Sequence, residues 1–227
     1  MSAPLRLLDD GIWVADRPLR LAGVEIGTRM TVIRLKDGRL LLHSPVPCDE
    51  ETRRALDAAG PVGFVLAPSK VHHFFVAPWK AAYPAATLLA APGLQEKRPG
   101  IPFDGVLEAD PPEAWRGAVE VELFRGATWI NEVVLFHAPS RTLVLTDLAM
   151  NFHSAPDLRT AIWQRVFDVR NRFGPTRFVR FIIRNHRAAR SSLERILAWD
   201  FERVTVTHGE VLEAGGKAAL RAAYAWL

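Results

Sequence analysis

The sequence predicts an α/β protein in which a sandwich of β-sheets is covered by helices. Strand patterns dominate the first part of the chain, and helices then alternate with strands. No glycine-rich phosphate-binding fingerprint and no P-loop is present, which argues against a Rossmann-type sheet. The 227 residues contain no internal repeat and no long linker rich in Gly or Ser, so we expect a single domain over residues 1–227.

A β-hairpin is predicted near the start of the chain. Residues 30–35 and 39–43 have strand patterns, and Lys36, Asp37 and Gly38 separate them. Asp-Gly favours the positive φ angles of a tight turn, so the two strands should pair directly. The N-terminal part is therefore expected to be rich in β-structure.

A helix and a buried strand should follow this hairpin. Asp49 is a good N-cap for a helix over residues 50–59, and Gly60 is a typical stop signal. Residues 62–67 are an apolar run of strand length that ends at Pro68. This strand leads directly into a segment that contains two histidines.

The second half of the chain combines a hairpin, a last strand and four helices. Residues 132–136 and 142–146 should form the hairpin, because Ala138, Pro139, Ser140 and Arg141 between them are suited to a turn. Residues 203–207 alternate β-branched and other side chains, as a strand does. Helical spacing of apolar residues predicts helices over residues 156–173, 175–184, 188–199 and 216–226.

Composition and charge restrict the class of protein. Hydrophobic residues make up 49% and charged residues 24% of the chain, a balance typical of globular proteins, and no apolar run is long enough to span a bilayer. Asp9 and Asp10 interrupt the N-terminal stretch that a secretory signal needs, and Cys48 is the one cysteine, so we expect a cytoplasmic protein. The net charge of +4 favours an anionic small-molecule partner. Membrane and nucleic-acid partners are not expected, since no nucleic-acid motif accompanies the arginines of residues 165–195.

Four side chains of the types that bind metals stand directly after three predicted strands. His72 and His73 follow residues 62–67, Asp147 follows residues 142–146, and His208 follows residues 203–207. Imidazole and carboxylate are ligands for Zn²⁺, Fe²⁺ or Mn²⁺. A single buried histidine is more often a hydrogen-bonded structural group, but four such groups at strand ends favour a shared site.

In the order of these residues the chain resembles the metallo-β-lactamase superfamily, an αββα sandwich whose ligands come in the same order. The resemblance spans most of the chain. Asp147, in Thr-Leu-Val-Leu-Thr-Asp, matches the bridging carboxylate of that superfamily, and His208, in His-Gly, matches its last histidine. The resemblance thus implies a metal-dependent hydrolase fold.

The sequence departs from the superfamily at its first ligand motif, His-x-His-x-Asp-His. Laid on this chain, the motif begins at Pro68, so that only His73 matches, while His72 stands where the superfamily has Asp and Lys70 replaces a histidine. The later isolated histidine falls on Ala127. All three ligands of the first metal are therefore missing, whereas His72, His73, Asp147 and His208 could hold one ion at the second position.

Several short segments resemble, more narrowly, an uncharacterised branch of this superfamily that is known as a domain of unknown function. That resemblance implies no particular reaction. The segments are Gly-Thr-Arg-Met-Thr, His-Ser-Pro-Val-Pro, His-His-Phe-Phe, Ser-Arg-Thr-Leu-Val-Leu-Thr-Asp and Trp-Asp-Phe.

Two interpretations of this altered site remain open. In the first, the four residues bind one divalent ion (Zn, Fe or Mn) in a hydrolase-like enzyme of unknown substrate, although four protein ligands would close a tetrahedral zinc site. In the second, the Lys70 ammonium occupies the place of the lost metal and pairs with Asp147. The protein would then be a catalytically silent, metal-free sandwich that binds an anionic ligand or a protein partner.

Two further residues have an ordinary structural interpretation beside a functional one. His43 ends a predicted strand and could line the same cleft, but a histidine there is more simply a hydrogen-bonded group at a turn. Cys48 has no histidine beside it in the sequence, so we interpret it as a small buried residue and not as a nucleophile. No catalytic residue is assigned from the sequence.

Overall fold

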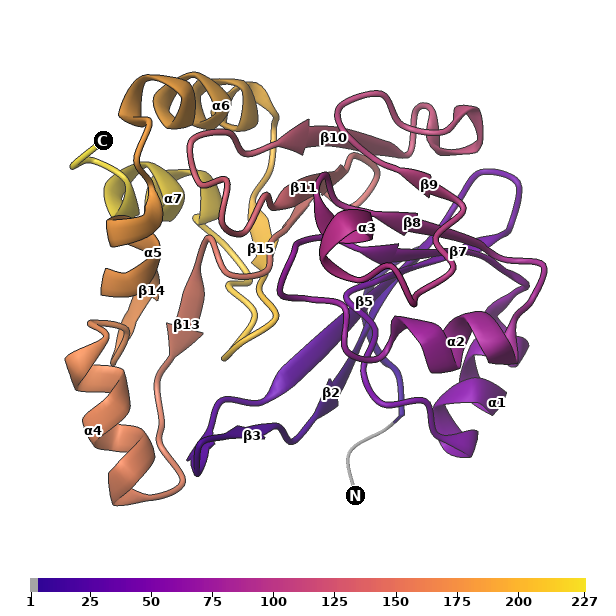
Figure 1. Ribbon diagram of the computed structural model, residues 1–227, viewed down its shortest axis with the longest axis horizontal. Helices are drawn as coiled ribbons and strands as arrows, with labels where there is room; N and C mark the ends of the chain where they lie inside the picture. The colour runs from indigo at the N-terminus through magenta and orange to yellow at the C-terminus, as the bar shows by residue number, and fades with distance from the viewer. Residues whose placement is uncertain (1–3) are drawn as a thin grey trace.

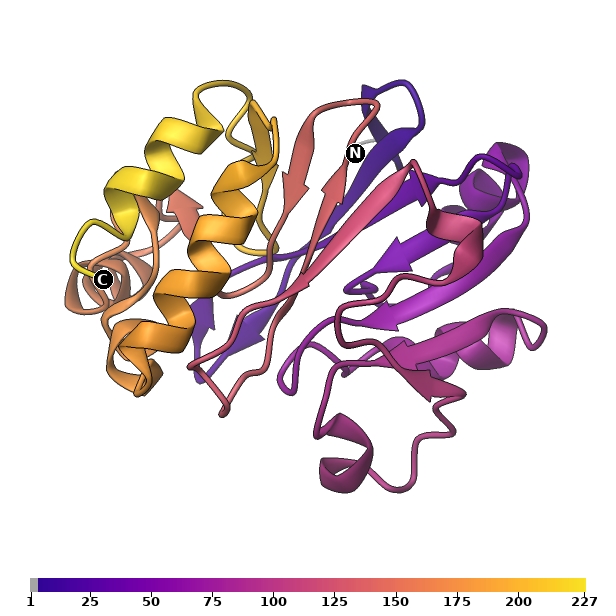
Figure 2. The same cartoon turned by 90° about the horizontal axis from the view of Figure 1, so that it is seen from above.

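The computed structural model describes residues 4–227 as two facing β-sheets with helices on both outer sides, which confirms the αββα sandwich (Figure 1, Figure 2). The first sheet has the strand order β1-β2-β5-β6-β7-β8-β9, with bounds Arg6–Asp9, Ile12–Arg17, Thr28–Arg34, Leu40–His43, Val62–Ala67, Thr87–Ala90 and Gly105–Val106. The second sheet has the order β10-β11-β12-β15, with bounds Val119–Leu123, Val133–His137, Thr142–Val144 and Arg203–Thr205.

Two small hairpins and the helices complete the described chain. The hairpins pair β3 with β4 and β13 with β14, with bounds Arg20–Leu21, Val24–Glu25, Met150–Phe152 and Arg172–Gly174. The helices α1 to α7 span Glu50–Ala59, Val76–Ala82, Leu94–Lys97, Leu158–Val166, Arg177–Ile182, His186–Ala198 and Gly216–Ala223, and a 3₁₀ turn spans Glu113–Trp115. Within residues 4–227, no helix has both the length and the apolar character that crossing a bilayer requires.

The local signals of the sequence correspond to observed elements. β5 and β6 form the predicted antiparallel hairpin, and β11 and β12 form the second one. Helix α1 begins and ends where expected, because the Asp49 carboxylate accepts the backbone N–H of Thr52 at 2.7 Å and Gly60 follows the last turn. β12 and β15 pair in parallel, with Val144 opposite Thr205, so both strands end at the same edge of the second sheet.

Side chains alternate along the strands and so fill separate cores on the two faces of each sheet. In β7, Phe64 and Leu66 belong to the core between the sheets, together with Leu135 of β11. Val65 belongs to the core beneath α1 and α2, together with the buried Trp79. A third core lies between the second sheet and the C-terminal helices and includes Leu143, Val179, Leu193 and Leu220.

The helix predicted over residues 156–173 is wrong in its second half. Helix α4 ends at Val166, and Asp168 and Asn171 adopt positive φ angles of 60° and 53° that an α-helix cannot contain. The Asp168 carboxylate holds this turn through ion pairs with Arg172 and Arg180. The chain then returns as β14, and the apolar residues of α4 do not all face the core.

His137 on β11 gives a pH prediction for stability. Burial lowers the pKa of His137 from 6.5 to about 4, and its Nδ1 lies 2.7 Å from the Ser140 hydroxyl. Because the unfolded chain takes up this proton at higher pH, the stabilisation is complete above pH 6.5 and is lost as the pH falls towards 4. The full effect is on the order of 3 kcal/mol.

We therefore expect His137→Gln to flatten the fall in unfolding free energy between pH 6.5 and 4, measured by denaturant titration at several pH values. The matched control is His186→Gln, because His186 is exposed. Equal slopes for His137→Gln and the unaltered protein would contradict the prediction.

Candidate metal centre

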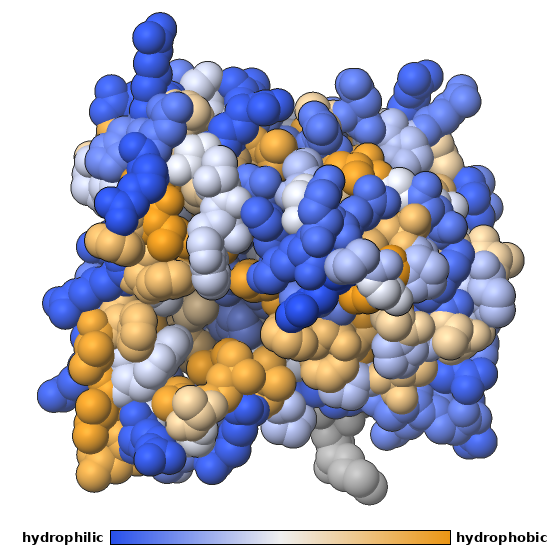
Figure 3. All heavy atoms as spheres, in the orientation of Figure 1, coloured by the Kyte–Doolittle hydropathy of each residue, from blue (hydrophilic) through white to orange (hydrophobic). Residues whose placement is uncertain are grey.

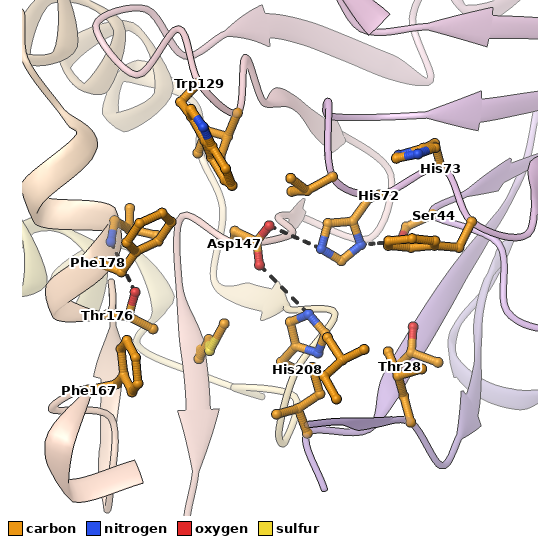
Figure 4. Close-up of a pocket in the computed structure, with 18 of the residues that line it drawn as sticks. Thr28, Ser44, His72, His73, Trp129, Asp147, Phe167, Thr176, Phe178 and His208 are labelled. Carbon is orange, nitrogen blue, oxygen red and sulfur yellow. Dashed lines mark hydrogen bonds and ion pairs between the residues drawn. The ribbon is translucent and has the colours of Figure 1, made fainter. Parts of the chain in front are cut away.

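Three side chains from both sheets meet at one edge of the sandwich (Figure 4). Asp147 and His208 follow β12 and β15, and the parallel pairing of these strands brings their ends together. His72 lies in the loop between β7 of the first sheet and α2. The cluster therefore exists only where the two sheets face each other.

The Asp147 carboxylate lies between the two imidazoles. Its Oδ2 is 3.1 Å from His72 Nε2, and its Oδ1 is 3.7 Å from His208 Nε2. One donor atom from each residue lies within 4.8 Å of the other two. Atoms that share a zinc ion at bond lengths of about 2.1 Å lie roughly 3 to 4 Å apart, so this spacing suits a common ion.

The Nδ1 atom of each imidazole, the ring nitrogen not directed at Asp147, has its own hydrogen-bond partner. His208 Nδ1 donates to the Gly27 carbonyl at 2.8 Å, which leaves the Nε2 lone pair free. His72 Nδ1 lies 3.0 Å from the Ser44 hydroxyl. Such outer hydrogen bonds fix the orientation of metal-binding histidines, and here both direct Nε2 towards Asp147.

The pKa values of the three groups are shifted in different directions. Burial acts to lower the pKa of His72, but the attraction of Asp147 and their hydrogen bond outweigh it and raise that pKa. Burial and the nearby charge of His72 lower the pKa of His208. Burial acts to raise the pKa of Asp147, but His72 and His208 hold it below its ordinary value. The shifts thus favour a charged Asp147 and a neutral His208, whose Nε2 can coordinate an ion.

Glu132 holds the loop that carries Asp147. Its role was not predicted from the sequence. Its side chain is fully buried and accepts the backbone N–H groups of Thr146, Asp147 and Leu148 at 2.6, 2.8 and 3.0 Å. Burial and the charge of Asp147 raise the pKa of Glu132 to about 7. A lone carboxylate at the start of an apolar strand was the one available signal of this role.

His73, predicted as a fourth ligand, is not part of the cluster. Its Nε2 accepts a hydrogen bond from Arg98 Nε at 2.7 Å, and its ring stacks on Phe74. Burial and the charge of Arg98 lower its pKa to about 4. In Figure 4 the ring lies apart from Asp147. Three protein ligands therefore remain, and the objection that four would close a zinc site no longer applies.

The predicted pair of Lys70 and Asp147 does not form. Lys70 Nζ donates to the Thr128 carbonyl at 3.1 Å in an exposed position, and the ion-pair partners of Asp147 among residues 4–227 are His72 and His208. The reason is that the backbone of Lys70 is tied to the neighbouring Ile130 carbonyl, which directs the side chain outwards. No lysine replaces a metal in this cluster.

His43, the other proposed cleft residue, is buried in β6 and is not among the residues that line the pocket. Burial and the nearby charge of His72 lower its pKa to about 3. Its neighbour Ser44 does face the pocket and adopts a positive φ of 51°. The turn after β6 thus presents Ser44 to His72 and keeps His43 inside the sheet.

The cluster opens onto a pocket of about 350 Å³. His72, Asp147 and His208 all line it, so a coordination position on an ion would face the cavity. Two imidazoles and one carboxylate form the donor set of open catalytic zinc sites and of non-haem iron sites. The residues present therefore fit a single divalent ion.

The position at which the resemblance would place a first metal has no donors among residues 4–227. Ala127 is fully buried in the apolar core, and the Lys70 side chain points away. Among residues 4–227, His72, Asp147 and His208 form the one group whose spacing would suit a metal. The altered motif thus corresponds to a site for at most one ion.

Solved structures of metallo-β-lactamases have the same fold. The enzyme from Erythrobacter litoralis superposes with a TM-score of 0.67 at 14% identity, covering 98% of this chain and 96% of that one. FIM-1 from Pseudomonas aeruginosa, in its mono-zinc form, gives a TM-score of 0.64 at 12% identity, covering 96% and 92%. No curated protein matches the sequence.

A family match covers more than half of the sequence. Residues 9–165 match the family described as "Domain of unknown function (DUF4336)". The matched segment contains His72 and Asp147, and His208 lies beyond it. The chain belongs to this DUF4336 family and has a metallo-β-lactamase-like fold.

Proposed function

We propose that this protein is a hydrolase that uses one divalent metal ion held by His72, Asp147 and His208. The observation that carries the proposal is the arrangement of these three donors around a common point, with the Nδ1 atom of each imidazole already held. An ion there would polarise a substrate oxygen and lower the pKa of a water molecule. FIM-1, which has a similar fold, is known in a mono-zinc form, and this supports a single ion in this fold.

The chain's own residues would prepare the site for this chemistry. Ser44 and the Gly27 carbonyl orient the imidazoles, and Glu132 fixes the backbone that carries Asp147. The surrounding apolar walls would limit the access of water around a bound substrate, which would strengthen electrostatic interactions inside the pocket. Zn, Fe and Mn all suit this donor set.

A second candidate function is a metal-free binding protein. The observation that favours it is the 3.1 Å contact between His72 and Asp147, since a protonated imidazole satisfies the carboxylate without any ion. In that case the pocket would bind a ligand and transform nothing. The two functions differ in one measurable property, the metal content.

We expect protein purified without added metal, or loaded with Zn²⁺, Fe²⁺ or Mn²⁺, to contain about one ion per chain by elemental analysis. The bound ion should also raise the melting temperature, and a chelator should reverse that increase, because an ion that binds the native state stabilises it. A content below about one tenth of an ion per chain, not increased by any of the three metals, would contradict the proposal and favour the metal-free protein.

A further inference from the structure

We propose that the pocket beside the cluster binds a substrate with an uncharged aromatic body and an ester or amide carbonyl at its polar end. The inference rests on the proposed function for the reaction, but the binding of the aromatic body does not depend on a metal. It follows from the side chains of the pocket wall, which is far more apolar than the cluster itself (Figure 3, Figure 4).

Aromatic rings form the wall that faces the cluster. Trp129 and Phe178 make an edge-to-face pair with ring centroids 5.2 Å apart, although they come from different segments of the chain. Phe167 and Trp163 of the α4 region form a second pair at 4.9 Å. Figure 4 shows Trp129, Phe178 and Phe167 on the side of Asp147 opposite His72. A planar ring placed between these pairs and the cluster would gain edge and face contacts.

Two of these rings are exposed to solvent. Trp129 is 53% and Phe178 is 40% exposed, although both line the cavity. Large apolar side chains at the entrance of a concave site are typical of ligand recognition, because a ligand covers them. The pair at the entrance therefore has a function that the hydrolytic cluster alone does not explain.

The wall offers no partner for an anionic group on the body of the substrate. Its 21 lining residues include no Lys, Arg or Glu, and its one carboxylate is Asp147 of the cluster. Two cations that contact lining residues have other partners: Lys97 lies over the Trp129 ring and donates to the Lys70 carbonyl, and Arg98 donates to His73. A buried unpaired charge is costly, so an uncharged body is favoured over a charged one.

Most polar groups of the cavity lie at one end. Thr28, Ser44 and the three cluster residues lie together there, as Figure 4 shows. Thr176, on the aromatic side, already accepts the Val179 backbone N–H at 3.0 Å. A carbonyl placed at the cluster end would direct its oxygen at the cluster while the ring occupies the apolar wall. Hydrolysis would then add water across the ester or amide bond and release an acid and an aromatic alcohol or amine.

Binding of 2-naphthol and of 6-hydroxy-2-naphthoate, followed by naphthol fluorescence, tests the recognition step on the protein as purified and after chelation. We expect the uncharged 2-naphthol to bind at least about tenfold more tightly than the anion after chelation, when no ion can coordinate the carboxylate. Phe178→Ser should weaken 2-naphthol binding about tenfold. Phe181→Ser should leave it unchanged, because Phe181 is an exposed residue of the same helix that does not line the pocket.

The binding results test this inference independently of the proposed hydrolase function. Equal or tighter binding of the anion to the chelated protein, or equal effects of the two serine variants, would overturn the inference even if 2-naphthyl acetate were hydrolysed. Selective binding of 2-naphthol to protein that holds no metal and hydrolyses no ester would support the inference and reject the hydrolase. Circular dichroism of both variants checks that each is folded.

Discussion

Replacement of Asp147 by alanine is expected to lower the affinity for a divalent ion by more than about 100-fold. Asp147 is the one carboxylate of the cluster and lies between both imidazoles, so its loss removes the negative charge and a donor atom together. His208→Ala should have a similar effect, because His208 contributes the neutral Nε2. Metal stoichiometry and chelator competition measure both effects.

The controls are three residues that the structure places outside the cluster. Lys70→Ala and His73→Ala should retain bound metal, since Lys70 contacts the Thr128 carbonyl and His73 contacts Arg98. His153→Ala should also retain it, because His153 is exposed and contacts Asn151. Retention of metal by both Asp147→Ala and His208→Ala would show that the ion binds at another site.

A second large effect is expected at Glu132, which never touches the proposed ion. Glu132→Ala leaves three buried N–H groups, at Thr146, Asp147 and Leu148, without their acceptor. Each unsatisfied buried donor costs at least about 1 kcal/mol, so the unfolding free energy should fall by about 3 kcal/mol or more. Denaturant titration measures this loss directly.

Glu132→Gln separates the positioning effect from unfolding. The amide keeps one acceptor oxygen but presents an NH₂ group to the remaining donors, so the variant should fold while its metal affinity falls about tenfold. Glu122→Gln is the matched control, because Glu122 is also buried but pairs with Arg195, away from the cluster. If Glu132→Gln bound metal as tightly as Glu122→Gln, the loop would not depend on this carboxylate.

Local signals in the sequence predicted most of the sandwich. Asp49 and Gly60 define the ends of α1, Asp37-Gly38 closes the first hairpin, and residues 62–67 form β7. Helix α4 shows where such signals fail. Ile162 and Val166 have helical spacing, yet both are more than half exposed, because Trp163 and Phe167 on the other side of this segment face the pocket. Periodicity alone does not show which apolar side faces the core.

The site could also be predicted only in part, because local sequence patterns do not show how loops and distant segments contact each other. Asp147 and His208 lie at strand ends, and strand pairing brings them together. His72 and His73 are adjacent in a loop, where no periodicity indicates which ring turns towards the other sheet. The roles of Ser44, Glu132 and the Gly27 carbonyl depend on contacts between distant segments, which the sequence of any one segment does not contain.

The parallel pairing of β12 with β15 has a consequence for the order in which the chain folds. Residues 145–202 lie between these neighbouring strands and include β13, α4, β14, α5 and α6. Closing so long a loop carries an entropic cost before any contact compensates it, so this pairing should form late in folding. His208 emerges last from the ribosome among the three donors, and a nascent chain that lacks β15 has no complete site. Ion capture would therefore mark the end of folding and would not nucleate it.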